Sequence, residues 1–206
     1  MIHGSGVVRA GQWARRLIIN DSLDSGTQLP YILKAQQEGF AILVLNTNLN
    51  SVKKDGTSTE IRGSESAVDH GLYVWKNLVL KKDFQNVMIV AHSYGGVVTV
   101  RIAAKYSNDW LKIVKAVALT DSVHNDLHIK NNKKLVSWFK KNAKNWVSSS
   151  KTIDTKICVD GSVIPCVSAG HIKHENTSWS AFTSVFNFLG ETEQRGMDSQ
   201  LSLIHI

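Results

Sequence analysis

The sequence of 206 residues predicts an α/β fold in which helices flank a parallel sheet. Continuous apolar runs are typical of strands that are buried on both faces, and three such runs are Phe40 to Leu45, Val87 to Ala91 and Val114 to Leu119. Segments with helical periodicity lie between the runs. Strands that alternate with helices pair in parallel through right-handed crossovers.

The helices and strands can be placed in chain order. Pro30 to Glu38 predicts a helix with proline in its first turn and Gly39 at its end. Two further helices are expected from Glu65 to Leu80 and from Gly95 to Tyr106, each before the next strand. After these come a short strand, Ile164 to Ala169, and a helix from about Ser178 to Leu189, whose apolar positions recur at spacings of three and four.

Two segments between these elements are interpreted as loops. The segment from Lys53 to Ser66 is the most polar stretch of the chain, and we expect it to be a loop. The segment from Asp121 to Ile153 is expected to be an excursion between strands that carries its own helix and forms a cap.

Length and composition favour one domain. A chain with 43% hydrophobic residues can bury a single sizeable core, which we place at residues 1–190. Only Met1 and Ile2 precede the first glycine turn, so we expect the sheet to be N-terminally truncated. From Glu191 onward helical periodicity is lost, and residues 191–206 are expected to be a disordered tail.

Charge and cysteine content narrow the class of protein. The formal net charge is +7, yet the lysines are dispersed, which favours a solvated surface over direct nucleic-acid binding. The densest basic group lies between Asn131 and Lys144. Two cysteines without metal-ligand spacing indicate neither a disulfide framework nor a metal site, and no cofactor motif is visible. No membrane span or signal peptide is predicted, so a nuclear or cytoplasmic location is expected.

One pentapeptide carries a chemical signal. Ala91-His92-Ser93-Tyr94-Gly95 follows an apolar strand and opens a helix, which is the pattern G-x-S-x-G with alanine in the first place. Such a turn holds a serine in a strained conformation with its hydroxyl above the edge of the sheet, where helix N–H groups stabilise negative charge. The sequence therefore predicts a nucleophile elbow at Ser93.

An acid and a histidine should follow this serine in the chain. Asp121 comes directly after the strand that ends near Leu119, although an Asx turn or a helix cap would also explain an aspartate there. His171 and His174 both follow the strand that ends at Ala169, and at least one of them must have another role.

A glycine turn supplies the last part of this pattern. In Gly4-Ser5-Gly6, backbone N–H groups can act beside that of Tyr94 as donors to an oxyanion, although glycine also simply makes turns. Glycine turn, elbow serine, acid and histidine occur in the order typical of an α/β-hydrolase fold. The other histidines have non-catalytic interpretations: His92 packs the turn, and His124 and His128 shape a pocket.

Several segments resemble one family closely. HGSGVVRAGQWARRLIIN, VMIVAHSYGGVVTVR, KAVALTDSVHN, NWVSSS and VSAGHIKHENTSW look like the Argonaute-binding Arb domain family of cotranscriptional regulators. The resemblance implies links to Argonaute, chromatin-associated proteins, small-RNA-directed silencing, heterochromatin and alternative splicing. It also implies a serine-hydrolase-like centre with Ser93 as nucleophile, His174 as general base and Asp121 as orienting acid. The C-terminal Leu203 to Ile206 is not an endoplasmic-reticulum retention signal.

Two functional hypotheses follow. The first is a regulatory protein that binds its partners through a hydrolase scaffold. The second is an active serine esterase or related acyl hydrolase that acts on an acyl substrate through Ser93, Asp121 and His174.

Overall fold

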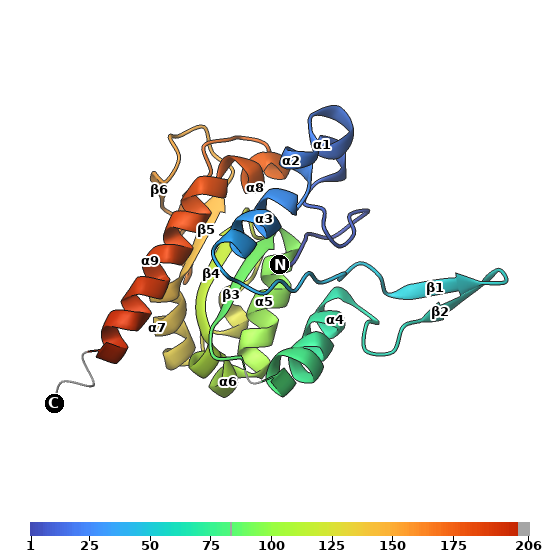
Figure 1. The fold of residues 1–206 in the computed structure, drawn as a ribbon, viewed down its shortest axis with the longest axis horizontal. Coiled ribbons are helices and arrows are strands. Elements are labelled where there is room, and N and C mark those ends of the chain that lie inside the picture. The colour runs from blue at the N-terminus through green and yellow to red at the C-terminus, as the bar shows by residue number, and fades with distance from the viewer. Residues whose placement is uncertain (83, 202–206) are drawn as a thin grey trace.

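The computed structural model describes residues 1–82 and 84–201, with side chains described as far as Thr192. Its centre is a five-stranded sheet in the order β3-β4-β5-β7-β6, and a separate two-stranded hairpin projects from the domain (Figure 1). The first four strands of the sheet run parallel, and β6 pairs antiparallel with β7. The α/β fold that the sequence predicts is therefore confirmed as a mixed, mostly parallel sheet flanked by helices.

The strands of the sheet are short, and the register brings their carboxyl ends together. In the register, His92 lies opposite Thr120, and Thr120 lies opposite Trp146. The strands are β3 Val87–His92, β4 Val114–Thr120, β5 Ala143–Val147, β6 Lys156–Ile157 and β7 Cys166–Ser168, and the hairpin consists of β1 Ser51–Lys54 and β2 Thr57–Glu60.

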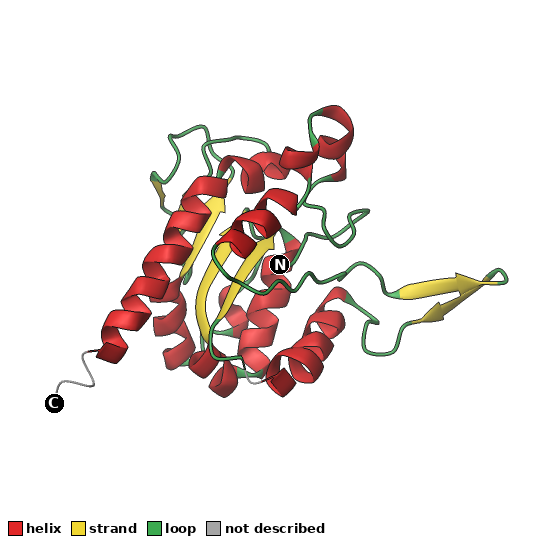
Figure 2. Ribbon diagram, in the orientation of Figure 1, coloured by secondary structure: helices red, strands yellow, loops and turns green. Residues whose placement is uncertain are grey.

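Helices cover both faces of the sheet (Figure 2). The described helices are α1 Arg15–Asn20, α2 Leu23–Gly26, α3 Leu29–Gln37, α4 Ala67–Val74, α5 Tyr94–Lys105, α6 Ser107–Ile113, α7 Lys133–Asn142, α8 Thr177–Ser180 and α9 Phe182–Leu201. A π-helical turn η1 Trp75–Val79 and three 3₁₀ turns, η2 Leu80–Lys82, η3 Asp126–His128 and η4 His174–Asn176, complete the set. Among the described residues, no helix combines the length and the apolar character that crossing a membrane requires.

Each face of the sheet packs against its own hydrophobic core. Ala91 and Leu119 belong to the core beneath α4 to α7, whereas their neighbours Val90 and Ala118 belong to the core beneath α3 and α9. Successive residues of a strand point to opposite faces, so a strand covered on both sides must be apolar at every position. This is why the runs at β3 and β4 identified these strands in the sequence.

The other predicted helices form with shifts of one or two residues at most boundaries, except that the helix expected from about Ser178 to Leu189 is divided at Ala181 into α8 and α9. Helix α3 has proline in its first turn and ends before Gly39, whose φ of +84° suits glycine. Ser66 begins α4 by accepting a hydrogen bond from the Asp69 N–H at 3.1 Å. The predicted helix from Glu65 to Leu80 is α4 continued by η1 and η2.

The strand predicted at Phe40 to Leu45 is wrong, because the segment runs extended without ladder pairing. Two hydrogen bonds join it to Met1: the Met1 amino group donates to Leu43 O at 2.6 Å, and Leu45 N donates to Met1 O at 3.1 Å. Ile2 in turn forms a single parallel bridge with Ala91. One paired residue cannot extend a ladder, so the apolar run lies beside the sheet without becoming a strand of it.

The cap expected from Asp121 to Ile153 is also wrong. The segment does contain a helix, α7, but it continues into β5, which lies inside the sheet between β4 and β7. Lys144 and Asn145 interrupt the apolar pattern of β5, which hides the strand in the sequence. The Lys144 ammonium lies 4.9 Å from the Phe188 ring centroid, and Asn145 Oδ1 accepts a hydrogen bond from Ser122 N at 3.1 Å.

Two other expectations differ in detail. The polar segment from Lys53 to Ser66 contains most of the hairpin, whose strand residues are all exposed. Helix α9 runs to Leu201, where the sequence had suggested a tail from Glu191, and residues 202–206 lie outside the described part of the chain.

Candidate functional site

Ser93 occupies the sharp turn between β3 and α5. Its φ of +53° and ψ of −119° lie in a region that non-glycine residues avoid, so the backbone is strained at this point. Backbone hydrogen bonds hold the turn, because Ser93 N donates to Thr120 O at 3.0 Å and Ser93 O accepts from Gly96 N at 3.1 Å. The geometry is that of a nucleophile elbow.

The two glycines after the elbow allow other segments to approach α5 closely. A Cβ atom at Gly95 would lie 2.4 Å from the carbonyl oxygen of Ile2. A Cβ atom at Gly96 would lie 1.8 Å from Ser122 Oγ. Both distances are far below van der Waals contact, so the small residues of the motif are needed by the packing around the turn as well as by the turn itself.

Asp121 and His174 lie within hydrogen-bond distance of each other. His174 Nδ1 donates to Asp121 Oδ2 at 2.8 Å, and Ser148 N donates to Asp121 Oδ1 at 3.0 Å. Asp121 follows β4 with a left-handed φ of +46°, and His174 opens η4, so 53 residues separate the partners along the chain. The Asp121 side chain is 17% exposed and the His174 side chain 45% exposed.

This hydrogen bond moves the pKa of both groups. The bond to Asp121 raises the pKa of His174 above its ordinary value, against a smaller lowering by burial. Burial by itself would raise the pKa of Asp121, but the hydrogen bonds from His174 and Ser148 together hold it below its ordinary value. A carboxylate that accepts from Nδ1 leaves Nε2 of a neutral His174 as the nitrogen able to take a proton.

His92 brings His174 close to the elbow. The two rings are in contact at 4.6 Å between centroids, and His92 directly precedes Ser93. His92 is buried, and its Nδ1 donates to Thr120 O at 2.9 Å. Burial, and then the neighbouring His174, lower the pKa of His92 to about 4, so this ring is neutral at physiological pH. It packs the turn, as the sequence suggested.

Gly4 lies against the Ser93 side chain. A Cβ atom at Gly4 would be 3.0 Å from Ser93 Cβ and 3.4 Å from Ser93 Oγ. The turn from Gly4 to Gly6 is held from the other side by Asn48, whose side-chain amide donates to Gly4 O at 2.9 Å and to Val8 O at 3.0 Å. The glycine turn and the elbow serine, 89 positions apart in the sequence, are thus neighbours in space.

Several backbone donors around Ser93 have no acceptor. In the described part of the chain, the N–H groups of Gly4, Ser5 and Gly6 donate no hydrogen bond. The N–H of Tyr94, at the first position of α5, has no acceptor within the helix. Ser93 Oγ likewise has no hydrogen-bond partner among residues 1–82 and 84–201, so no hydrogen bond joins Ser93 to His174.

Two of the other histidine candidates, His171 and His124, have structural partners. His171 Nδ1 accepts a hydrogen bond from Lys173 N at 3.0 Å, which is a role within the loop. His124 Nδ1 lies 2.8 Å from Ser122 Oγ, and its Nε2 lies 3.4 Å from Asp126 Oδ1. Ser122, His124 and Asp126 therefore form a second series of the same residue types, which is pressed against Gly96. His128 is exposed at the end of the 3₁₀ turn η3 and lies outside both series.

The arrangement contains residue types that acyl-transfer centres use. A half-buried turn carries a serine hydroxyl, a carboxylate orients the histidine whose ring contacts the preceding His92, and unpaired N–H groups flank the serine. Within the described residues, no three His, Cys, Asp or Glu side chains gather as metal ligands do.

The Arb2 domain family matches residues 1–153 of the chain. The chain belongs to this family. Similar proteins are the cotranscriptional regulator ARB2A homolog of Xenopus tropicalis, 39% identical over 94% of this chain and 58% of that protein, and the cotranscriptional regulator ARB2A of Mus musculus, 39% identical over 97% and 60%. The human cotranscriptional regulator ARB2A is 39% identical over 94% and 58%. The chain thus spans less than two thirds of these relatives, and no solved structure matches it.

The sequence analysis did not identify three hydrogen-bonding groups that hold the candidate site in place. Asn48 holds the glycine turn, the Ser148 N–H holds Asp121, and Ser178 Oγ lies 2.7 Å from Thr120 Oγ1 beneath the elbow. Three asparagines alternate with other residues from Asn46 to Asn50, and this pattern could have drawn attention to the first support. Ser148 and Ser178 act through contacts with residues distant in the chain, which no local sequence pattern predicts.

The titration of His174 tests the Asp121 contact directly. We expect its ring signals in an NMR titration to have a midpoint above the ordinary histidine value, because the protonated form gains the bond to the carboxylate. Asp121→Asn should move this midpoint down, since it removes the carboxylate that contributes most to raising the pKa of His174 while burial still lowers it. Asp55→Asn, at the tip of the hairpin, is the matched control and should leave it in place. An unchanged midpoint in Asp121→Asn would contradict the geometry.

Proposed function

We propose that this Arb2 domain belongs to a nuclear cotranscriptional regulator and works by binding partner proteins. The observation that carries the proposal is 39% identity, over almost the whole chain, to proteins named cotranscriptional regulators. In its finer form the proposal names Argonaute and chromatin-associated proteins as partners. The processes would then be small-RNA-directed silencing, heterochromatin formation and alternative splicing.

The outer face of α7 is suited to bind an acidic partner. Leu135 and Phe139 bury the inner face of this helix. The exposed residues of this helix include four lysines, Lys133, Lys134, Lys140 and Lys141. Helical spacing places these lysines on neighbouring parts of one face. No acidic residue lies in α7, so a negatively charged segment would meet an unopposed positive field there.

Neutralising this lysine face tests the binding proposal. We expect replacement of Lys133, Lys134, Lys140 and Lys141 by glutamine to reduce Argonaute pull-down at least about tenfold, because each lysine contributes to attraction across the interface. The same replacement of Lys53, Lys54, Lys81 and Lys82, which are exposed elsewhere, is the matched control for net charge. Ser93→Ala should bind normally. Equal loss in both lysine variants, or loss with Ser93→Ala, would contradict this face as the binding site.

A second proposal is that the same domain is a serine acyl hydrolase on an α/β-hydrolase scaffold. Its support is the strained Ser93 turn together with the Asp121–His174 hydrogen bond. Ser93 Oγ would attack an acyl carbonyl, while His174 Nε2 takes its proton and Asp121 holds the ring. The N–H groups of Tyr94 and of Ser5 or Gly6 would bind the oxyanion. Catalytic hydrogen bonds between serine and histidine often form only when substrate is bound. The lack of a hydrogen bond between Ser93 and His174 is therefore compatible with this role.

A further inference from the structure

Lysine side chains gather at the end of the domain where β3, β4 and β5 begin. The chain enters β3 through η2 and residues 84–86, β4 through the end of α5 and through α6, and β5 through the end of α7. Because these strands are parallel, the segments that lead into them lie at one end of the domain (Figure 1). We call residues 80–82, 84–86, 105–113 and 140–142 the amino-end surface. Its lysines are Lys81, Lys82, Lys105, Lys112, Lys140 and Lys141.

The lysines of the amino-end surface carry unopposed charge. All of them are exposed, and in the part of the chain that the structure describes none lies within ion-pair distance of a carboxylate. Asp109 is the one acidic residue described on this surface. Along the sequence the lysines are dispersed, which favoured a solvated surface, but the fold collects their charges into one region of positive potential.

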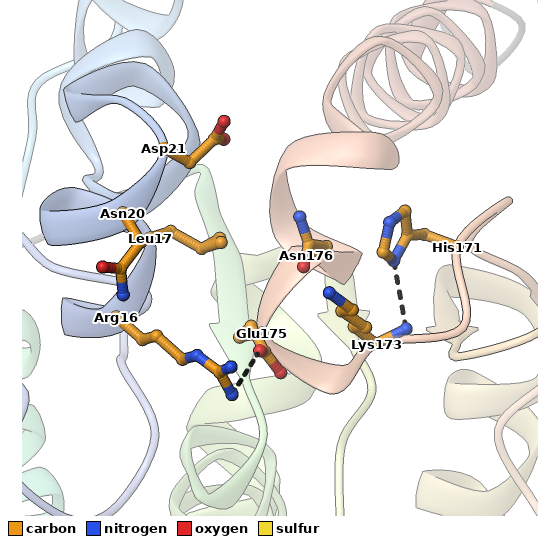
Figure 3. A pocket seen from close by; sticks show the side chains of 8 residues that line it. All are labelled: Arg16, Leu17, Asn20, Asp21, His171, Lys173, Glu175 and Asn176. Carbon is orange, nitrogen blue, oxygen red and sulfur yellow. Dashed lines mark hydrogen bonds and ion pairs between the residues drawn. The ribbon is translucent and has the colours of Figure 1, made fainter.

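The opposite end of the domain, where the strands finish, carries mixed charge. A pocket of about 460 Å³ between α1 and η4 is lined by Arg16 and Lys173 but also by Asp21 and Glu175. The Arg16 guanidinium lies 3.7 Å from the Glu175 carboxylate, as the dashed line in Figure 3 shows. An anionic ligand would meet both attraction and repulsion at this pocket. At the amino-end surface it would meet mainly attraction.

Aromatic rings lie among the lysines of the amino-end surface. Phe84, in the segment before β3, is 42% exposed. Tyr106, between α5 and α6, is half-buried, and Lys105 Nζ lies 5.9 Å from the centroid of its ring. An accessible ring offers a flat face on which a nucleobase can stack, while neighbouring cationic groups follow the phosphate backbone. Lysines combined with accessible rings therefore suit a ligand that carries both phosphates and bases.

The form of the surface favours a single strand over a duplex. Reading the bases of a duplex requires a helix or a two-stranded ribbon that enters a groove, whereas this surface consists of turns and helix ends. Neighbouring strands of a sheet are about 4.8 Å apart, so the segments that lead into β3, β4 and β5 are spread over about 10 Å. A flexible strand of a few nucleotides can follow such a surface, and its unstacked bases are free to meet the rings.

We propose that the amino-end surface binds single-stranded nucleic acid, with lysines contacting the phosphates and with Phe84 and Tyr106 stacking on bases. This activity goes beyond partner-protein binding and hydrolysis, and it does not depend on Ser93. An acidic protein segment would pair with the lysines but would bring no bases to the rings. Lys140 and Lys141 also belong to the lysine face of α7, so the test uses other lysines of the surface.

Fluorescence anisotropy with a labelled oligouridylate tests the phosphate contacts. In Lys81→Gln/Lys82→Gln/Lys112→Gln we expect affinity to fall at least about tenfold at low salt. The slope of log affinity against log salt concentration should decrease in magnitude by about 2, because each phosphate contact to a single strand contributes about 0.7. The replaced side chains are exposed, so the core remains packed and the loss reports binding.

Lys53→Gln/Lys54→Gln/Lys151→Gln is the matched control, since it removes the same charge from exposed positions elsewhere. It should bind as the unaltered protein does. Phe84→Ala tests stacking separately: we expect about a tenfold loss of affinity with the salt slope unchanged, because no phosphate contact is removed. An unchanged affinity in Phe84→Ala and in a Tyr106→Ala variant would contradict the stacking role.

Competition against the labelled strand decides the class of ligand. Oligothymidylate should compete if phosphates and bases suffice, and competition by unlabelled oligouridylate alone would assign recognition to the 2′-hydroxyl groups; both results support a single-strand site. Polyglutamate has charge but no bases and should compete at least about tenfold less well. Equal competition by polyglutamate or by an RNA duplex, equal loss in the two lysine variants, or no binding of the labelled strand would overturn the proposal.

Discussion

Ser93→Ala is expected to abolish covalent labelling by a fluorophosphonate and to lower ester hydrolysis at least about 10³-fold, if the domain is a hydrolase. The reason is local: the strained turn carries one hydroxyl beside the glycine turn, and the residue before it, His92, contacts the His174 ring. Removing that oxygen leaves the Asp121–His174 pair and the N–H donors in place without a nucleophile. Intact-mass spectrometry after labelling measures the outcome, with about one added probe per chain in the unaltered protein.

Ser122→Ala is the informative control for this experiment. Ser122 Oγ also lies beside a histidine nitrogen, at 2.8 Å from His124 Nδ1, and His124 also contacts an aspartate. The two serines therefore have similar partners, but Ser122 is packed against Gly96 and its backbone is not at the elbow. We expect Ser122→Ala to be labelled fully. Labelling that survives Ser93→Ala and disappears in Ser122→Ala would assign the reactive centre to the second series.

Gly95→Ala is expected to lower the free energy of unfolding by about 3 kcal/mol, at the upper end of the usual cost of overpacking. The added methyl group would lie 2.4 Å from the carbonyl oxygen of Ile2, and that oxygen accepts the hydrogen bond of His92 N at 3.0 Å. A backbone atom cannot turn aside as a side chain can. The bridge between Ile2 and β3 must therefore open or α5 must shift. Urea denaturation followed by circular dichroism measures the change.

Gly190→Ala is the matched control, since it makes the same substitution in another helix. No atom lies within 4 Å of a Cβ at Gly190, and alanine is the better helix former. We expect this variant to be more stable by roughly 0.5 to 1 kcal/mol. If Gly95→Ala were as stable as the unaltered protein, the close approach of Ile2 to the elbow would be refuted.

The central strands and the elbow could be predicted because their signals are local. β3 and β4 are covered on both faces, which requires consecutive apolar residues, and Ser93 needs small neighbours to make its turn. These requirements act on residues that are adjacent in the chain. For that reason Val87 to Ala91 and Val114 to Leu119 identified strands to within one residue at their ends.

The expectation that an apolar run forms a strand failed for segments whose place in the sheet depends on strand pairing. Phe40 to Leu45 is as apolar as β3, but Met1 is its hydrogen-bonded neighbour and no ladder forms. β5 has the reverse character, because its polar residues become acceptable only through Phe188 and Ser122. An apolar run shows that a segment can be buried, and only the assembled sheet shows whether a partner strand is available.

The order of residue types along the chain by itself determined an α/β scaffold, a serine at a strained turn, and the set of acid and histidine candidates for it. Only the tertiary structure decided that His174 meets Asp121 while His171 bonds within its own loop, and that Gly4 rests on the Ser93 side chain. The physical reason is range. Secondary structure and turn strain depend on neighbouring residues, whereas a hydrogen bond across 53 positions exists only once parallel strands have brought their carboxyl ends to one edge.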